Sequence, residues 1–314
     1  MPLQKLRANY LSTLHNDETK RAYGRDIAAF LHHLDLAEGT LGDLERLGLP
    51  VLYGALYEFL QSYFKWDEAK QHVINQKTFN RVRQGNASFF KYLQMFYGLP
   101  FNPACYIKKL RERKKSNTPD LTEDEVIHLL WRLKTRAPRS QKDARDFLMV
   151  LGLTLQAVRR SELAAFSWTA IDQQQGSIRI HQKGGSEKIL PVPPGYLRLL
   201  NEFGDKYGRP CPFIFRPIRN NRYKNMNRPV STDTIYRVVK KIAQEVVPEK
   251  NISPHSFRTT FVSLGIKWQV HITAIQNGGG WSTVEMVFYY DRNNPLEFSL
   301  INIMGERFHK EKII

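Results

Sequence analysis

Apolar side chains in the first hundred residues recur every three or four positions, the spacing at which they share one face of a helix. Asn16 or Asp17 can cap the first such stretch. Gly98-Leu99-Pro100 ends the last one, because proline cannot continue a helix. The pattern predicts three helices, whose apolar positions are Tyr23, Ile27, Phe30, Leu31 and Leu34; Leu52, Leu56, Phe59, Leu60 and Tyr63; and Phe79, Val82, Phe89, Phe90 and Leu93.

Beyond residue 120 the same spacing predicts further helices. Thr122 and Glu125 have the spacing of a capping box ahead of an apolar face. A long apolar helix is expected over residues 142–155. A short helix can begin at Ser161, and later helices are expected to begin near Ser231, Ser253 and Ser282.

One stretch alternates between apolar and polar residues, as strands do. Residues 177–181 and 188–192 flank Gly184-Gly185, a pair typical of hairpin turns. The chain is therefore predicted to be mainly α with a small antiparallel β-sheet, an α+β fold.

The segment 108–119 is the clearest boundary in the chain, because its basic run ends in Ser-Asn-Thr-Pro. Such a run is commonly a solvated linker, and beside DNA it could also lie along the phosphates. We therefore expect a helical domain over 1–107, the basic linker, a second domain over 120–294 and a tail over 295–314.

The chain carries 47 Lys and Arg against 30 Asp and Glu, a formal net charge of +17. This charge favours a polyanionic partner, although a solvated basic surface or a membrane surface would also accommodate it. Membrane binding is the weaker alternative, because no basic stretch has a bulky apolar face. No apolar run approaches ~18 residues and no leader opens the chain, so a cytoplasmic, nucleoid-associated protein is expected. Cys105 and Cys211 are too few for a disulfide framework or a cysteine-rich metal site.

Basic residues gather in the third helix, in the linker and in an acid-free segment over 216–228. The candidates for contact with DNA phosphates are Lys77, Arg81, Arg83, Lys108, Lys109, Arg113, Lys114, Arg219, Arg222 and Lys224.

The sequence Ser253-Pro254 predicts a helix start, with serine as the N-cap and proline at the first helical position. His255 and Arg258 then share one face of the first turns, where the peptide dipoles favour an anion. The pair could bind phosphate, although a hydrogen-bonded histidine and a surface arginine would also explain it.

Arg159 lies just before Glu162, and its planar guanidinium suits bidentate binding of phosphate oxygens. A salt bridge to Glu162 is the alternative, and Arg160 competes with Arg159 for the phosphate role. Lys183 lies before the hairpin turn, where it could donate a proton to a leaving oxygen; Lys188, across the turn, is the alternative.

Tyr289 and Tyr290 follow Ser282 and Glu285, which have capping-box spacing, on a helix whose core face is expected to be Val284, Val287 and Phe288. Periodicity does not choose between the two tyrosines. A phenol has a pKa of about 10, so it attacks phosphorus only beside a base or in a strong positive field.

Taken in order, these residues resemble the tyrosine recombinase (phage integrase) family. The matching residues are Arg159-Arg160-Ser161-Glu162-Leu163, the stretch from Lys183 to Val192, His255-Ser256-Phe257-Arg258, Gly280-Trp281 and Tyr290. Residues 19–26 and Asn102-Pro103-Ala104 resemble the helical core-binding domain of that family. The resemblance thus covers most of the chain.

The resemblance implies a DNA-binding core-binding domain, then a catalytic domain that works without metal or cofactor. Arg159 and Arg258 would hold the non-bridging oxygens of the scissile phosphate. The other roles it implies are Lys183 as general acid for the 5′ oxygen, His255 in proton transfer, Trp281 as a hydrogen-bond donor in place of a second histidine, Tyr290 as the nucleophile that forms a 3′-phosphotyrosine, and Glu162 as a brace.

The resemblance also implies a homotetramer on double-stranded DNA that carries a specific recombination site, a Holliday junction intermediate, and accessory DNA-bending proteins as possible further partners. The tail over 295–314 could dock on a neighbouring subunit or pack on its own domain. The chain departs from the family where Thr-Gly-Leu is usual and it has Gln156-Ala157-Val158, and Arg160 stands where an apolar residue is common. Both departures could alter the loop that carries Arg159.

Two alternatives remain at this point. A type IB topoisomerase would use the same chemistry to relax supercoils as a monomer, and a DNA-binding regulator would have lost strand cleavage. The recombinase-like N-terminal half argues against the first, and the complete set of catalytic side chains argues against the second.

Overall fold

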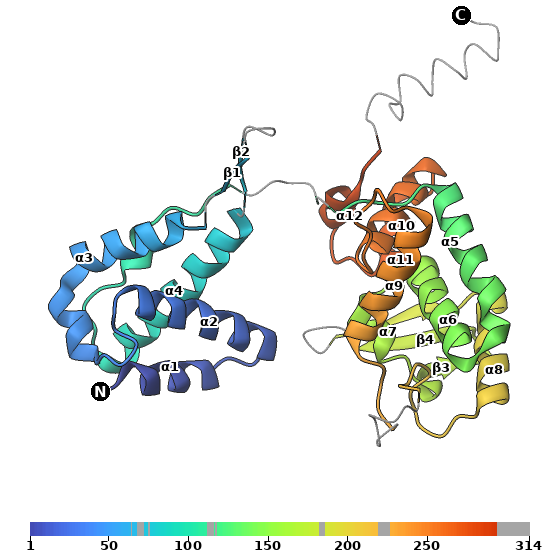
Figure 1. Ribbon diagram of the computed structural model, residues 1–314, viewed down its shortest axis with the longest axis horizontal. Coiled ribbons are helices and arrows are strands. Elements are labelled where there is room, and N and C mark those ends of the chain that lie inside the picture. The colour runs from blue at the N-terminus through green and yellow to red at the C-terminus, as the bar shows by residue number, and fades with distance from the viewer. Residues whose placement is uncertain are drawn as a thin grey trace, which may run out of the picture. The chain divides into compact units, whose positions relative to one another are not determined.

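The protein is described by a computed structural model in which two compact units, Met1–Arg113 and Lys114–Ile314, each have their own hydrophobic core (Figure 1). The residues that the structure describes are 1–63, 65–67, 72–74, 76–111, 116, 118–181, 186–218 and 227–293. Both units are predominantly helical.

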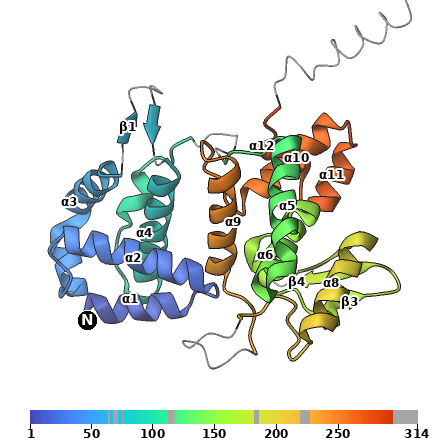
Figure 2. The ribbon, with the colours of Figure 1, turned by 45° about the vertical axis from the view of Figure 1, so that its right-hand side comes forward.

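The described part of the first unit contains four α-helices and a short antiparallel hairpin. Its elements are α1 (Leu3–Ser12), α2 (Asp17–His33), α3 (Leu41–Gln61), β1 (Lys65–Asp67), β2 (His72–Ile74), α4 (Gln76–Tyr97) and the 3-10 turn η1 (Pro103–Tyr106). Asn16 caps α2, since its side chain accepts a hydrogen bond of 3.0 Å from the backbone N–H of Thr19. Tilted and edge-on contacts among phenylalanines fill the core, where α2 packs against α4 (Figure 2).

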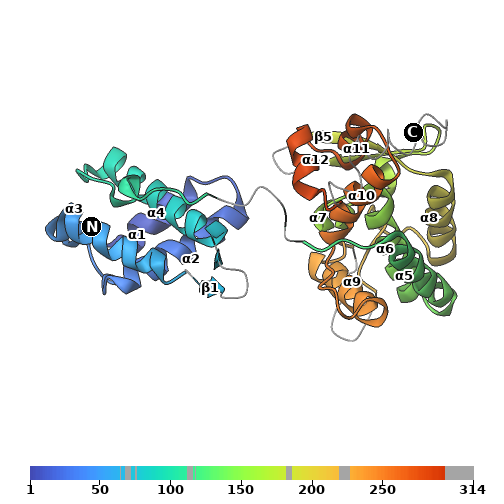
Figure 3. The same cartoon turned by 90° about the horizontal axis from the view of Figure 1, so that it is seen from above.

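The second unit combines a group of helices with a three-stranded antiparallel sheet in the order β3-β4-β5. Its elements are α5 (Glu123–Arg136), η2 (Ala137–Arg139), α6 (Gln141–Gln156), α7 (Arg160–Ala164), η3 (Trp168–Ala170), β3 (Ile171–Asp172), β4 (Ser177–His181), β5 (Glu187–Pro191), α8 (Pro194–Tyr207), α9 (Thr232–Val246), α10 (Ser256–Lys267), α11 (Ile272–Gly279) and α12 (Val284–Tyr290). The apolar helix α6 is the centre of the unit, and α5, α8, α9 and α10 pack against it (Figure 3). The mainly helical fold with a small antiparallel sheet is confirmed.

Cap residues explain why several helices begin where the sequence predicts. Thr122 and Glu125 form both hydrogen bonds of the capping box at α5, at 3.3 and 2.7 Å. Ser231 caps α9 through a hydrogen bond of 3.1 Å from the N–H of Thr234. No helix among the described residues is long and apolar enough to cross a membrane.

The cap residues predicted for two helices near the C-terminal end are wrong. Helix α10 begins at Ser256 rather than at Ser253, because the backbone of Ser253 closes a turn with Ser256 by hydrogen bonds of 2.9 and 3.1 Å. Helix α12 begins after Thr283, so Ser282 is not its cap. The predicted core face of α12 is also wrong, since Phe288 is 54% exposed and the buried residues are Val287 and Tyr290.

Candidate active site

Arg159 lies at the N-terminal end of α7, directly after the turn that ends α6. Its Nη1 donates to Glu162 Oε1 at 2.7 Å, and its backbone N–H donates to Glu162 Oε2 at 2.9 Å. The salt bridge that the sequence offered as an alternative is therefore formed. It occupies only part of the guanidinium, whose side chain remains 43% exposed and able to meet a ligand.

Lys188 shares the Glu162 carboxylate with Arg159. Its Nζ lies 3.7 Å from Glu162 Oε2, its side chain is only 10% exposed, and no described residue accepts a hydrogen bond from it. Burial lowers the pKa of Lys188, as do the charges of Arg258 and Arg159, and Glu162 opposes this shift. Gly280, at φ +62°, closes the site on this side, since a Cβ there would lie 2.7 Å from Nζ.

The shared carboxylate stays ionised in this setting. Burial on its own would raise the pKa of Glu162. The hydrogen bonds from Arg159 and the charges of Lys188 and Arg159 outweigh burial and lower that pKa. Glu162 therefore holds one arginine and one lysine in place while remaining negatively charged.

Arg258 is the most deeply buried cation of the site, with 1% of its surface exposed. Its Nη1 donates to the carbonyls of Ala157 and, at 3.3 Å, of Gly279. Its Nε and Nη2 have no acceptor in hydrogen-bond geometry among the described residues, and the Tyr290 side chain is a neighbour of the guanidinium. Burial lowers the pKa of Arg258, and the nearby charge of Arg159 lowers it further, so the two guanidiniums act on the same space.

The Trp281 ring makes a cation–π contact with the Arg258 guanidinium, whose Cζ lies 4.6 Å from the ring centroid. The indole lies flat against Gly279, where a Cβ would come within 1.6 Å of a ring carbon. Trp281 is 5% exposed, and its Nε1–H has no acceptor among the described residues.

Tyr290 completes the cluster at the end of α12. It is 6% exposed, and its ring centroid lies 5.6 Å from that of Trp281 and 5.3 Å from that of His255. The Arg258 Cζ lies 5.9 Å from the same ring. Tyr289 is half-buried against Tyr290, and its carbonyl accepts from the N–H of Ser116. The structure thus places Tyr290 among the cations, a choice that periodicity left open.

Of the residues to which the resemblance gave a role, the structure brings together six, from α7, α10 and α12 and the loops beside them. They are Arg159, Glu162, His255, Arg258, Trp281 and Tyr290. Lys183 lies outside the described residues, and Lys188 lies inside the cluster. Alternation along β5 could have indicated this, because Lys188 is two residues from the buried Leu190 and so shares its face, whereas Ile189 is 65% exposed.

The cluster is strongly electropositive. Arg159, Arg258 and protonated Lys188 face the single carboxylate of Glu162, which leaves a formal local charge of +2. Cations and N–H donors fixed in a buried setting suit an anion that gains charge as it reacts. No group of three or more His, Cys, Asp or Glu side chains among the described residues could hold a metal ion.

The basic residues predicted to contact DNA fall into two groups. In the first unit Arg81 pairs with the buried Asp26, and Arg83 donates to the carbonyl of Ile107, so both help to hold the fold. Lys77, Lys108 and Lys109 are exposed. Those that lie outside the described residues are Arg113, Lys114, Arg219, Arg222 and Lys224.

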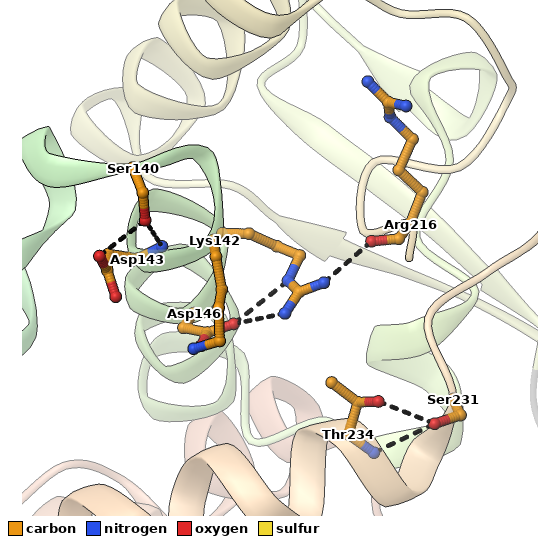
Figure 4. Close-up of polar contacts among 8 residues, drawn as sticks. Ser140, Lys142, Asp143, Asp146, Arg216, Ser231 and Thr234 are labelled. Atoms are coloured by element: carbon orange, nitrogen blue, oxygen red, sulfur yellow. Dashed lines mark hydrogen bonds and ion pairs between the residues drawn. The ribbon is translucent and has the colours of Figure 1, made fainter. Parts of the chain in front are cut away.

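The first end of the acid-free segment over 216–228 is fixed by a buried ion pair. Arg145 donates to Asp146 at 2.8 Å and, through its other nitrogen, to the carbonyl of Arg216 at 3.1 Å (Figure 4). Lys142 adds a second cation at 2.7 Å from Asp146. After the segment, the Ser231 cap of α9 fixes the chain again.

A mainly helical domain with a cationic cluster around a buried phenol is the kind of site that can hold a phosphodiester beside a tyrosine. The family model described as "Phage integrase family" matches residues 119–297, more than half of the 314 residues. The chain therefore belongs to the phage integrase family, the tyrosine-type site-specific DNA recombinases.

Individual relatives agree with this assignment. A tyrosine recombinase from Thermosipho africanus is 27% identical over 278 residues, 88% of this chain and 89% of that protein. The tyrosine recombinase XerD from Chlorobaculum tepidum is 26% identical over 304 residues, 93% of this chain and 98% of its own.

The fold is similar to those of solved recombinases. A lambda integrase dimer bound to a COC′ core site matches with a TM-score of 0.64 at 17% identity, over 93% of this chain and 96% of that chain. XerH bound to its difH substrate before cleavage matches with a TM-score of 0.64 at 17% identity, over 88% and 78%.

Proposed function

We propose that the cluster around Tyr290 binds one phosphodiester of a DNA recombination site and transfers it to the tyrosine. The observation that supports this is a set of three buried N–H donors with no acceptor in hydrogen-bond geometry among the described residues: Arg258 Nε and Nη2, and Trp281 Nε1. A buried donor without a partner destabilises a protein by roughly 1–3 kcal/mol, so three in one place point to a ligand that supplies acceptors. Non-bridging phosphate oxygens supply them.

In this proposal Arg258 and Arg159 hold the non-bridging oxygens, and Trp281 donates to one of them. The phenol oxygen of Tyr290 attacks phosphorus, the bond to the 5′ oxygen breaks, and a 3′-phosphotyrosine forms. Lys183 gives the leaving 5′ oxygen its proton, His255 assists proton transfer at the phenol, and Glu162 braces Arg159 and Lys188. The attack of a different 5′-hydroxyl on the phosphotyrosine then joins new strands without ATP.

Lys188 is the second candidate for the leaving-group proton. Its Nζ is buried beside Arg258, and burial and the neighbouring cations lower its pKa, which makes its proton easier to release. A substrate whose 5′ bridging oxygen is replaced by sulfur separates the two lysines, because a thiolate leaves without a proton. We expect this sulfur to restore cleavage to Lys183→Ala and not to Lys188→Ala.

The Tyr290→Phe variant tests the nucleophile. We expect it to bind DNA like the wild type and to form no covalent adduct on a nicked substrate that traps the cleaved strand. Tyr289→Phe is the matched control and should keep forming adducts. Adducts that persist in Tyr290→Phe and disappear in Tyr289→Phe would show that Tyr289 is the nucleophile and would contradict the proposal.

We further propose that four subunits assemble on two DNA sites and that the tail over 295–314, which lies outside the described residues, docks on a neighbouring subunit. An apolar hollow of about 350 Å³ supports this, because its lining residues Ile127 and Trp268 are 59% and 56% exposed. The tail is rich in apolar residues such as Leu296 and Phe298. Sedimentation on DNA should show that a chain ending at residue 294 binds single sites and does not form tetramers. A tail that packs on its own subunit would leave the tetramer unchanged.

The proposal also specifies the substrate and the cellular location of the protein. Double-stranded DNA with a specific recombination site is the substrate, and the nucleoid is the place of action. Formation of Holliday junctions from two site-bearing duplexes would distinguish recombination from the relaxation of supercoils. The need for accessory DNA-bending proteins is measured by comparing linear and supercoiled substrates.

A further inference from the structure

The C-terminal end of the basic linker is hydrogen-bonded to both sides of Tyr290. The N–H of Ser116 donates to the carbonyl of Tyr289 at 2.9 Å. Arg292 Nη2 donates to the carbonyl of Thr118 at 2.9 Å. The residue before the phenol and the second residue after it are therefore both held by Ser116 and residues 118–121, which we together term the strap.

The strap is itself fixed to the helix that carries Arg258. The N–H of Leu121 donates to Thr260 Oγ1 on α10 at 2.9 Å, and Thr260 is 2% exposed. Asn293 Nδ2 donates to the carbonyl of Ser263, also on α10, at 3.0 Å. Helix α12 is thus attached to α10 in two ways: by the hydrogen bond of Asn293, which follows the helix, and through the strap.

Helix α12 needs such attachments, because it has seven residues and buries only Val287 and Tyr290. An isolated helix of this length has little stability of its own in water. Its position relative to the phosphate is then set by the residues that hold its ends.

We propose that the strap and Arg292 position the nucleophile, so that the Tyr290 oxygen faces the phosphorus that Arg258 holds. The inference rests on the proposed function of Tyr290. In this proposal Arg292 acts through α12, which it joins to the strap. The strap begins within the basic linker, so a linker bound along DNA would act on the position of the nucleophile.

The Arg292→Ala variant of the full chain tests this in single-turnover cleavage at saturating DNA. Displacement of a reacting group by about 1 Å can slow a reaction roughly a hundredfold, so we expect a loss of about ten- to a hundredfold with unchanged DNA affinity. Arg292→Lys should recover part of the rate, because an ammonium group can still donate to the Thr118 carbonyl. Arg46→Ala, at a side chain that is 80% exposed in the first unit, is the control for removal of one charge and should cleave normally.

A bridging-sulfur substrate separates nucleophile positioning from proton donation. The Tyr290 oxygen forms its bond to phosphorus, the bond from phosphorus to sulfur breaks, and the 5′ thiolate leaves without a proton. We expect this substrate to restore cleavage to Lys183→Ala and not to Arg292→Ala. The proposal would be overturned if the sulfur substrate restored cleavage to Arg292→Ala, or if this variant cleaved ordinary DNA at the wild-type rate.

A second pair of variants keeps the test independent of Arg292. Ser116→Pro removes the N–H that Tyr289 accepts from, whereas Ser116→Ala keeps it; only the proline variant should cleave slowly while its melting temperature stays close to that of the alanine variant. Equal rates in the two variants would contradict the strap. Failure of the proposed function is a separate outcome, since it requires adducts in Tyr290→Phe.

Discussion

The position of Trp281 in the site depends on a neighbouring residue without a side chain. Gly279 lets the indole of Trp281 lie against the backbone, and the indole in turn supports Arg258. The sequence Gly280-Trp281 indicated the tryptophan by family resemblance, and the role of Gly279 becomes visible only from the ring that covers it.

Gly279→Ala should therefore disable cleavage. Its Cβ would lie 1.6 Å from a ring carbon, so Trp281 must leave its position and Arg258 loses its cation–π contact. We expect a loss of at least about a hundredfold in cleavage rate and of roughly 1–3 kcal/mol in the free energy of unfolding. Urea unfolding and single-turnover cleavage measure the two effects.

Gly54→Ala is the matched control for that substitution. A Cβ on Gly54 meets nothing within 4 Å, and the residue lies inside α3, where alanine is the better helix former. The control should raise the free energy of unfolding by up to about 1 kcal/mol and leave cleavage unchanged. A Gly279→Ala enzyme as active as this control would contradict the contact.

The Glu162 carboxylate makes stability depend on pH. Its pKa is lowered in the folded protein, so the unfolded chain binds the proton more readily in the interval below the ordinary value near 4.5. The stabilisation is complete above that value and is lost as pH falls through the folded pKa. Glu162→Gln should lose stability at pH 7 and lack this acid-dependent part, as urea unfolding at pH 7 and at pH 4 would show. A wild-type pH profile in the variant would contradict the assigned ion pairs.

Helices with caps and a clean apolar stripe could be predicted from sequence to within a residue or two, whereas the starts of α10 and α12 and the buried face of α12 could not. Asn16, Thr122 and Ser231 cap the helices they were expected to cap. The start of α10 was misplaced because the backbone of Ser253 is used in a turn. The face of α12 was misjudged because Tyr290 is buried by an aromatic and cationic cluster, which periodicity does not report.

The site shows the same division between what the residues indicate and what their packing adds. The order of Arg159, His255 and Arg258 along the chain indicated their common chemistry. The choice between Lys183 and Lys188 depends on which lysine points inward, and alternation within β5 carried that information only for Lys188. Helices α1, α8 and α11 and the hairpin β1–β2 were not predicted.

The ion pair between Arg145 and Asp146 supports α6 and the carbonyl of Arg216 together. Asp146→Ala would leave the Arg145 charge buried without its partner, which should lower the free energy of unfolding by about 3 kcal/mol or more. Asp233→Ala, at a pair with both side chains more than 70% exposed, is the control and should change it by less than about 1 kcal/mol. Equal effects in urea unfolding would show that the buried pair has no special role.

The net charge of +17 favours binding to DNA phosphates. In the structure some basic residues stabilise the fold, and others are exposed and can contact phosphates. If about 6 to 10 phosphates are neutralised, affinity for DNA should fall roughly a thousandfold or more between about 50 and 200 mM salt. Replacing Lys108 and Lys109 together by alanine should reduce the slope of log affinity against log salt by about two, one for each phosphate contact. Anisotropy titrations with labelled DNA measure it.

Arg83→Ala is the counterpart for that titration. Arg83 donates to the carbonyl of Ile107, so its loss should lower the stability of the first unit and leave the salt slope nearly unchanged. The assignment would be contradicted if the salt slope stayed the same after Lys108 and Lys109 are replaced, or if it fell after Arg83 is replaced.

The incomplete hydrogen bonding of Arg258 has a practical consequence for handling the enzyme. A guanidinium that is 1% exposed and has two nitrogens without a described acceptor will also bind small inorganic oxyanions of phosphate-like size. Sulfate or phosphate in a buffer should therefore raise the melting temperature of the free protein and compete with DNA for it. Assays in chloride and in sulfate at equal ionic strength would then report different apparent affinities for the same duplex.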